Sequence, residues 1–479
     1  MKVELHILQN FAPSNLNRDD TGTPKSCEFG GYRRARVSSQ ALKRTARTYA
    51  QKNGALRITE KEENDPTLNP FSKGSMLFKT ELVTRLVKKS GKNEQEARAV
   101  ADFIFAETNL IKNKEDDKSG YRLVLGEAQF EQLRRLCENH WSAFADLLGN
   151  TEAEAKLKEA IKETEKEKRK IEKDQKKKDT PELQAKLKAV NDDLSKKKAD
   201  LENAQKTVKA AEGNLKNVVK EAETILDTKS AADTAMFGRM ITSAPQFSID
   251  AASQVSHAIS TNVVNDVELD YFAALDDLKD SKDPGAAHIN TAEFNSACYY
   301  RYANVDIEQL QRNLKDGGND LVRNTLEAFL QAFVLAVPTG KQNTFATPVP
   351  PSLVLAVIRD GARCSLANAF EKPISDWEKE EDGITGSSIR RLARHFNRLE
   401  ELYGDFNGKR AAFVFTEEPE YLEYKEKKRD AEADGEEGKK QTKKLAAKDT
   451  ASLKTLIDEV IGVVFPEDKP NGDQKGAAE

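Results

Sequence analysis

Cysteines are few in this sequence, and it has no long apolar run. The 479 residues include only 4 cysteines, and none of them forms a CxxC or CxxH pair: Cys27, Cys137, Cys298 and Cys364. This spacing indicates neither a zinc site nor a disulfide framework, and it fits reduced thiols in a cytosol. No apolar run approaches the roughly 20 residues that a membrane helix needs. The opening residues alternate like a strand and lack the apolar core of a signal peptide. We therefore expect a soluble, cytoplasmic protein with no membrane partner.

Charged residues are unevenly distributed along the chain. They make up 33% of the sequence against 38% hydrophobic residues, and the net charge is -4. Much of the charge is concentrated in residues 152–229 and 417–449, so the remainder has the composition of an ordinary globular protein. This length and composition predict about two to four modules with their own cores.

Basic residues cluster near the amino end. Seven cations stand there against one acid, Glu28: Lys25, Arg33, Arg34, Arg36, Lys43, Arg44 and Arg47. A local cationic excess in an acidic chain predicts binding of a polyanion, because each cation that pairs with a phosphate releases condensed counterions. The simpler alternative is a solvated helix face.

The order of residue types in this stretch favours phosphate binding. A turn-rich segment, residues 17–24, leads through Gly30 and Gly31 into an extended run. Ser38 or Ser39 is then expected to cap a helix with the sequence SQALKRTARTYA. Hydroxyls, backbone amides and the partial positive charge of a helix N-terminus all hold phosphates well. The stretch therefore predicts a nucleic-acid site.

Six motifs carry a resemblance to a known family. They are SNLNRDDTG, FGGYRRARVSSQALKR, FGRM, HAIST, FNSACYYRYAN and SLANAFEK, spread in this order over most of the chain. Together they resemble the CasC family, the backbone subunit of the type I-E CRISPR surveillance complex, Cascade. The resemblance implies an α+β fold with an RRM-like (ferredoxin-like) palm, a helical fingers lobe and a β-hairpin thumb.

The resemblance also implies a function and partners. Such a subunit is not catalytic; its copies polymerise head to tail along CRISPR RNA and kink this guide, whose bases then pair with target DNA in antiviral defence. The expected partners are CRISPR RNA, other copies of the chain, other Cascade subunits and, through the guide, target DNA. A recruited helicase-nuclease cuts the target. No cofactor or metal is expected.

The candidate RNA-binding residues come mainly from the basic stretch. They are Arg18, Lys25, Arg33, Arg34, Arg36, Ser38, Gln40, Lys43, Arg44 and Arg47, with Lys341 in a PTGKQ loop that resembles a family loop near the guide. The aromatic motif by which RRM sheets stack bases is missing, so we expect contacts to the RNA backbone to dominate. The run containing Tyr299, Tyr300 and Tyr302 allows either an RNA-stacking face or the packing of a central strand.

A base wedge is implied by the same resemblance. Met240 of the FGRM motif and Phe272 of the thumb match residues that clamp a guide base. A thioether and a phenyl ring can enter between bases without needing hydrogen bonds of their own. The alternative for both residues is packing in a core.

The expected modules follow one another along the chain. Residues 2–11 alternate in polarity and predict a half-buried first strand. The modules are a palm (1–54), helical fingers (55–150), a coiled-coil insertion (151–229), a palm continuation (230–262), the thumb hairpin (263–296), the second part of the palm (297–416), a flexible or singly helical charged linker (417–449), and a final helix with a disordered tail (450–479).

The insertion departs from the usual family length. Apolar residues recur at three- and four-residue spacing in two stretches, with a breaker at residues 179–181 and one interruption at Lys197. This pattern predicts an antiparallel coiled-coil hairpin. The favoured interpretation is a solvated structural arm, and a weak hold on duplex DNA by its basic first helix is a further hypothesis.

An enzyme is the main alternative function. A RAMP-type endoribonuclease that processes CRISPR RNA would use histidines for acid-base chemistry, for which His257 and His288 are available, or metal ions held by Asp19 and Asp20. Neighbouring aspartates point in different directions and no third ligand is evident. We therefore expect no catalytic residue.

Overall fold

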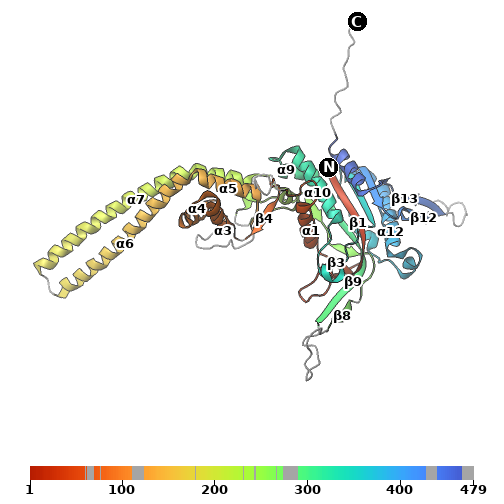
Figure 1. The fold of residues 1–479 in the computed structure, drawn as a ribbon, viewed down its shortest axis with the longest axis horizontal. Helices are drawn as coiled ribbons and strands as arrows, with labels where there is room; N and C mark the ends of the chain where they lie inside the picture. The colour runs from red at the N-terminus through yellow and green to blue at the C-terminus, as the bar shows by residue number, and fades with distance from the viewer. Residues whose placement is uncertain are drawn as a thin grey trace, which may run out of the picture. The chain divides into compact units, whose positions relative to one another are not determined.

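The computed structural model describes residues 1–59, 61, 69–75, 77–110, 123–177, 180–229, 231–241, 244–265, 267–272, 290–427 and 440–466. The chain divides into two compact units (Figure 1). We call them the sheet unit, which comprises Met1–Glu60, Ala232–Gly238 and Ile249–Glu479, and the helical unit, which comprises Lys61–Ala231 and Arg239–Ser248. Among the described helices, none has the length and apolar character needed to cross a bilayer.

The sheet unit is built on a 10-stranded sheet whose main path runs β14-β11-β10-β1-β9-β7-β3-β2, with β6 and β8 also paired to β9. Its strand pairs are antiparallel except for the parallel pair β11 and β14. The strands are β1 (Lys2–Ser14), β2 (Ser26–Phe29), β3 (Tyr32–Val37), β6 (Ser253–Val255), β7 (Ala258–Ser260), β8 (Glu268–Phe272), β9 (Asn290–Asp306), β10 (Leu353–Arg359), β11 (Lys409–Thr416) and β14 (Lys448–Asp449).

Helices cover both faces of this sheet. On one face, Leu42, Phe333 and Leu456 from three helices pack with Leu5 of β1. On the other, Phe396 packs with buried residues of β9 and β10. The helices are α1 (Ser39–Lys52), α8 (Ala232–Phe237), α9 (Ile307–Asn313), α10 (Gly318–Leu335), α11 (Gln342–Phe345), α12 (Asp376–Asn407) and α13 (Leu453–Val464). The expected α+β class is therefore confirmed.

The first strand is buried on both faces, so the prediction of a half-buried strand was wrong. Glu4 and His6 are as inaccessible as their apolar neighbours. Glu4 accepts hydrogen bonds from Nε of Arg359 (2.8 Å) and from the amide of Cys364 (2.6 Å). A buried charge needs such partners, and here they come from β10 and the loop that follows it. The alternation therefore separates side chains that enter two different buried layers, and neither face of the strand is exposed to solvent.

The tyrosines of β9 belong to these cores. Tyr299, Tyr300 and Tyr302 are all less than 10% exposed. The hydroxyl of Tyr300 accepts a hydrogen bond from the amide of Leu366 at 2.9 Å. Of the two interpretations of this run, the packing of a central strand is the one that the structure supports.

The helical unit has its own core. A short β4–β5 pair joins helices whose buried faces contain Leu82, Ile104, Phe130 and Leu215. Its elements are β4 (Ser72–Ser75), α3 (Phe78–Ser90), α4 (Glu94–Glu107), β5 (Leu123–Gly126), α5 (Glu127–Asn139), α6 (Trp141–Lys177), α7 (Pro181–Asp227) and the 3-10 turn η2 (Pro245–Phe247). The helix α6 runs without a break through residue 150, and α7 contributes to the core, so the structure places no boundary between the expected fingers and the expected insertion.

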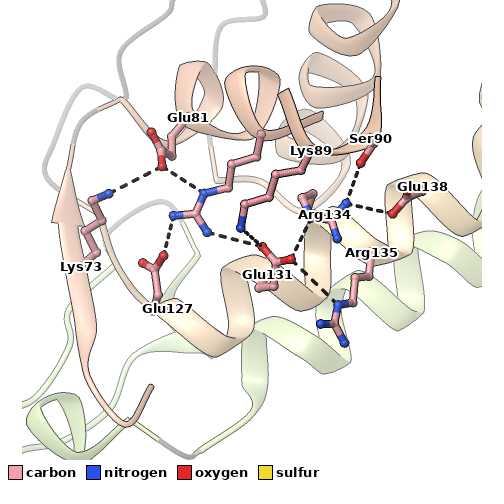
Figure 2. Close-up of polar contacts among 10 residues, drawn as sticks. Lys73, Glu81, Lys89, Ser90, Glu127, Glu131, Arg134, Arg135 and Glu138 are labelled. Carbon is pink, nitrogen blue, oxygen red and sulfur yellow. Dashed lines mark hydrogen bonds and ion pairs between the residues drawn. The ribbon is translucent and has the colours of Figure 1, made fainter. Parts of the chain in front are cut away.

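A buried carboxylate ties α3 to α5 in this unit (Figure 2). The side chain of Glu131 is 4% exposed, and its oxygens lie 2.9 Å from Nε of Arg134 and 3.6 Å from Nη1 of Arg85. Arg85 also pairs with Glu127 at 2.5 Å. The buried carboxylate is thus paired with positive charges, which offset the free-energy cost of removing it from water.

Helices α6 and α7 lie side by side (Figure 1). Lys197, which interrupts the apolar rhythm, donates a hydrogen bond to Oγ1 of Thr164 at 2.8 Å. Lys198 pairs with Glu165 at 3.2 Å. The polar interruption is therefore satisfied across the seam between the two helices.

The expected charged linker, residues 417–449, is not a flexible or singly helical segment where the structure describes it. It contains the 3-10 turn η4 (Pro419–Leu422) and an antiparallel pair of strands, β12 (Glu423–Lys427) and β13 (Lys440–Lys444). Tyr424 and Leu445 are buried, and the Tyr424 hydroxyl accepts a hydrogen bond from Asn397 at 3.0 Å. A few apolar residues suffice to fix this charged segment on α12.

Two other expectations lie partly outside the described residues. The arms of the expected thumb, β8 and the start of β9, pair in register. Its turn, with Pro284, Gly285 and His288, lies outside the described residues, as does the tail from residue 467 onward.

Candidate nucleic-acid interface

The basic stretch begins with a loop that is tied to the start of α1. Oδ1 of Asn17 accepts a hydrogen bond from the amide of Ser38 (2.9 Å), and the carbonyl of Asn17 accepts one from the amide of Lys25 (2.8 Å). A bridge between Arg18 and Pro24 closes the loop. These bonds hold Arg18 and Lys25 beside the N-terminus of the helix.

The aspartates of this loop shape its turn. Oδ1 of Asp19 accepts hydrogen bonds from the amides of Thr21 and Thr23, both at 3.0 Å, and from the Thr21 hydroxyl at 2.7 Å. These bonds, that from the Thr21 hydroxyl foremost, hold the pKa of the Asp19 carboxyl below its usual value. Among the described residues, no group of three or more His, Cys, Asp or Glu side chains is placed to hold a metal ion.

Arg34 does not face solvent, in contrast to its predicted role. It is fully buried, and its two Nη atoms donate to the carbonyls of Ser260 (2.7 Å), Thr261 (3.3 Å), Phe370 (2.7 Å) and Glu371 (3.0 Å). Burial lowers the pKa of this guanidinium. We therefore remove Arg34 from the candidate phosphate contacts and assign it to the packing of the hairpin.

Two further candidates have structural partners. The hydroxyl of Ser38 is the N-cap of α1 and accepts from the amide of Ala41 at 3.2 Å. Arg47 pairs with the buried Asp233 at 2.5 Å, which joins α1 to α8. Ser38 and Arg47 therefore have structural roles: the first caps α1, and the second attaches α1 to α8.

Six of the predicted cations have no side-chain partner within the described part of the chain. We call them the N-terminal cation set: Arg18, Lys25, Arg33, Lys43, Arg44 and Lys341. Arg36 lies beside them and makes one long bond to the carbonyl of Ser26 (3.4 Å). Gln40 is exposed on the first turn of α1. Their positive charge is thus available to an external anion.

The loop that carries Lys341 packs against the loop after β1. A Cβ atom on Gly340 would overlap the carbonyl oxygens of Asn15 and Leu16, so only glycine allows this approach. Lys341 itself has a positive φ of 43°, a costly conformation for a residue with a side chain. The close approach places the Lys341 loop beside the loop that carries Arg18, more than 300 residues away in the sequence.

A groove runs between α1 and this loop. Its volume is about 570 Å³, and Arg44, Thr48 and Lys52 line it from one face of α1, opposite residues 335–340 and Gln342. Lys52 was not among the predicted residues, although its spacing from Arg44 and Thr48 places the three on one helix face. His257 was considered only as a catalytic candidate of the alternative enzyme; in the structure its Nδ1 accepts a hydrogen bond from the amide of Ser39 at 2.8 Å.

The structure contains no RNA and does not test the predicted base wedge, Met240 and Phe272. Met240 is 80% exposed, so packing in a core does not explain it. Its neighbour Arg239 is buried and donates to the carbonyls of Phe247 (2.8 Å) and Leu226 (3.1 Å), which fixes the backbone at this point of the helical unit. Phe272 ends β8 of the sheet unit.

Two solved structures are similar to the chain over nearly its whole length. The first is described as "CRISPR RNA-guided surveillance complex, pre-nicking"; it is 23% identical, with a TM-score of 0.66, and the match covers 97% of this chain and 100% of that one. The second, "CRISPR RNA-guided surveillance complex", is 19% identical with a TM-score of 0.58 and the same coverage. At these identities the likeness shows the fold. No curated protein matches the chain significantly. A model of the CT1975-like protein family matches residues 3–440, and the chain therefore belongs to that family.

Proposed function

We propose that the protein is a CRISPR RNA-binding backbone subunit of a CRISPR surveillance complex. The observation that carries the proposal is the N-terminal cation set, which gathers unpaired positive charge from the loop after β1, the β2–β3 hairpin, α1 and the Lys341 loop. The fold supports it, because both similar structures are described as RNA-guided surveillance complexes.

The proposed mode of binding is a grip on the RNA backbone. Lysine and arginine side chains pair with phosphates without reading the bases. The tyrosines of β9 are buried, so they offer no stacking platform. When nucleotides are held only through their phosphates, their bases remain available to pair with target DNA. Base pairing then reads the sequence.

The finer assignment to the type I-E CasC subunit is part of the proposal. The central strands follow the order β10-β1-β9-β7, with α1 after β1 and α10 between β9 and β10. This arrangement supports an RRM-like palm of the β-α-β-β-α-β kind. Copies would assemble head to tail along the guide, which Met240 and Phe272 would kink, together with other subunits of the complex. The paired helices α6 and α7 would be its coiled-coil arm.

We also propose that the subunit is not catalytic. An endoribonuclease would need a free base or a metal cluster at the RNA. The Asp19 carboxylate already accepts hydrogen bonds from its own turn, and Nδ1 of His257 accepts one from the amide of Ser39. Repeat RNA incubated with the purified protein, with and without Mg²⁺, should stay intact. Cleavage that is lost in an Asp19→Asn or His257→Asn variant would instead support the RAMP-type enzyme.

The main experiment is co-expression with a CRISPR array, followed by purification and measurement of bound RNA. The triple variant R18E/R33E/R44E reverses three exposed members of the cation set and should lose most of the RNA. The matched control K315E/R323E/K454E makes the same charge change at exposed positions on other elements and should retain it. Equal RNA contents in the two variants, or no RNA in the parent protein, would overturn the proposal.

A further inference from the structure

The outer face of helix α6 carries a large excess of positive charge between residues 162 and 176. The helix packs on α7 through a seam formed by Ile161, Thr164, Lys168, Ile171 and Gln175, all less exposed than most of their neighbours. The spacing of these residues is that of heptad positions a and d. Positions b, c and f then face away from α7. Between residues 162 and 176 these outward positions hold six cations and one acid: Lys162, Glu163, Lys166, Arg169, Lys170, Lys173 and Lys176.

The acids of the same segment lie elsewhere. The four e and g positions beside the seam are all acidic: Glu165, Glu167, Glu172 and Asp174. Glu165 pairs with Lys198 of α7 at 3.2 Å, and Glu172 lies 3.8 Å from Lys168. One of these acids thus pairs across to α7 and one pairs with a seam lysine. In the described part of the hairpin, no acid forms an ion pair with an outward cation of this segment.

Helix α7 provides an internal comparison. Thr164 contacts Lys197 and Glu165 contacts Lys198, so residues 162–176 lie beside about residues 185–199 of α7. The outward positions of α7 there hold two lysines, Lys188 and Lys196, and one acid, Asp192, and the others are alanine or serine. A face that serves only solvation needs no large excess of one sign, and α7 has an excess of one cation where α6 has five. The excess on α6 is therefore a specific feature of that helix.

We infer that the outward face of α6 between Lys162 and Lys176 binds the phosphate backbone of a nucleic-acid duplex. The stripe spans about 21 Å at 1.5 Å per residue, and a duplex offers one negative charge about every 1.7 Å along its axis. All seven outward positions are charged, so this face lacks the apolar centre that a protein interface normally buries. The ligand and the surface both differ from those of the proposed CRISPR RNA grip, which belongs to the sheet unit.

The test uses the full-length protein and a 30-base-pair DNA duplex of arbitrary sequence. Binding is followed by fluorescence anisotropy between 50 and 200 mM salt. The variant K166Q/K173Q removes two cations at f positions of α6, and the control K188Q/K196Q removes two from the outward face of α7. If both α6 lysines contact phosphates, the slope of log affinity against log salt falls by about 1.8. The affinity near 0.1 M salt then falls at least tenfold, whereas the control matches the parent.

Three outcomes would overturn the inference. They are equal losses in the two variants, no loss in either, and binding of polyglutamate that exceeds binding of the duplex, which would point to an acidic protein. Circular dichroism checks that both variants keep their helices. Both should also retain co-purified CRISPR RNA, so a loss of RNA in R18E/R33E/R44E tests the proposed function separately.

Discussion

The backbone amide of Ser39 donates a hydrogen bond of 2.8 Å to Nδ1 of His257. An unprotonated Nδ1 is required for this bond, so the imidazole is neutral when the first turn of α1 is in place. Partial burial, and then the charges of Arg36 and Lys25, hold the pKa of His257 below its usual 6.5. The histidine thus holds the N-terminus of the helix that carries Lys43 and Arg44.

This bond predicts a pH dependence. Because the folded-state pKa is lowered, the unfolded chain binds the proton more readily. The stability contributed by His257 is therefore present above pH 6.5 and lost as the pH falls from there through the folded pKa. NMR titration should give His257 a pKa below 6.5, and the melting temperature should fall between pH 7 and pH 5. In His257→Asn, whose side-chain oxygen accepts the same bond without titrating, that fall should be smaller. An equal fall in both proteins would contradict the assignment.

The neighbours Arg33 and Arg34 should behave in opposite ways. Arg34→Met leaves four carbonyls, three of them buried, without their donors and should lower the free energy of unfolding by about 3 kcal/mol. Arg33→Met, at an exposed position, should change it by less than about 0.5 kcal/mol but should weaken RNA binding. Denaturant unfolding and RNA co-purification measure the two effects. The assignment fails if Arg33→Met is the more destabilised variant.

This pair shows how much the sequence can predict. The basic loop, the Ser38 cap and the long helices follow from local patterns, because their determinants lie within a few residues of one another. The burial of Arg34 depends on carbonyls more than 200 residues away. Glu4 likewise depends on Arg359, 355 positions later. No local pattern distinguishes such a cation from one that faces a phosphate.

Gly340 should be intolerant of even one added carbon. In Gly340→Ala the new methyl group overlaps the carbonyls of Asn15 and Leu16, so the Lys341 loop must move away from the loop after β1. We expect a loss of about 1–3 kcal/mol in stability, as for other overpacked sites, together with weaker RNA binding. Gly462→Ala is the control, because a Cβ there meets nothing within 4 Å. Equal behaviour of the two alanine variants would show that the close approach is unimportant.

Met240 offers the sharpest test of the proposed base wedge, because its side chain is exposed and its removal should not disturb folding. Met240→Ala should leave the free energy of unfolding within about 0.5 kcal/mol of the parent. If the thioether enters between guide bases, the alanine variant should lose periodic protection of co-purified RNA in nuclease footprints. Met240→Leu keeps an apolar wedge and should retain the pattern, whereas Met240→Gln, of similar length but polar, should not.

Phe272→Ala should weaken RNA binding further, since stacking on an aromatic ring contributes about 1–3 kcal/mol per base. A footprint that is the same in the alanine, leucine and glutamine variants would assign Met240 no part in holding the guide, and the phosphate grip of the N-terminal cation set would then have to set the RNA path by itself.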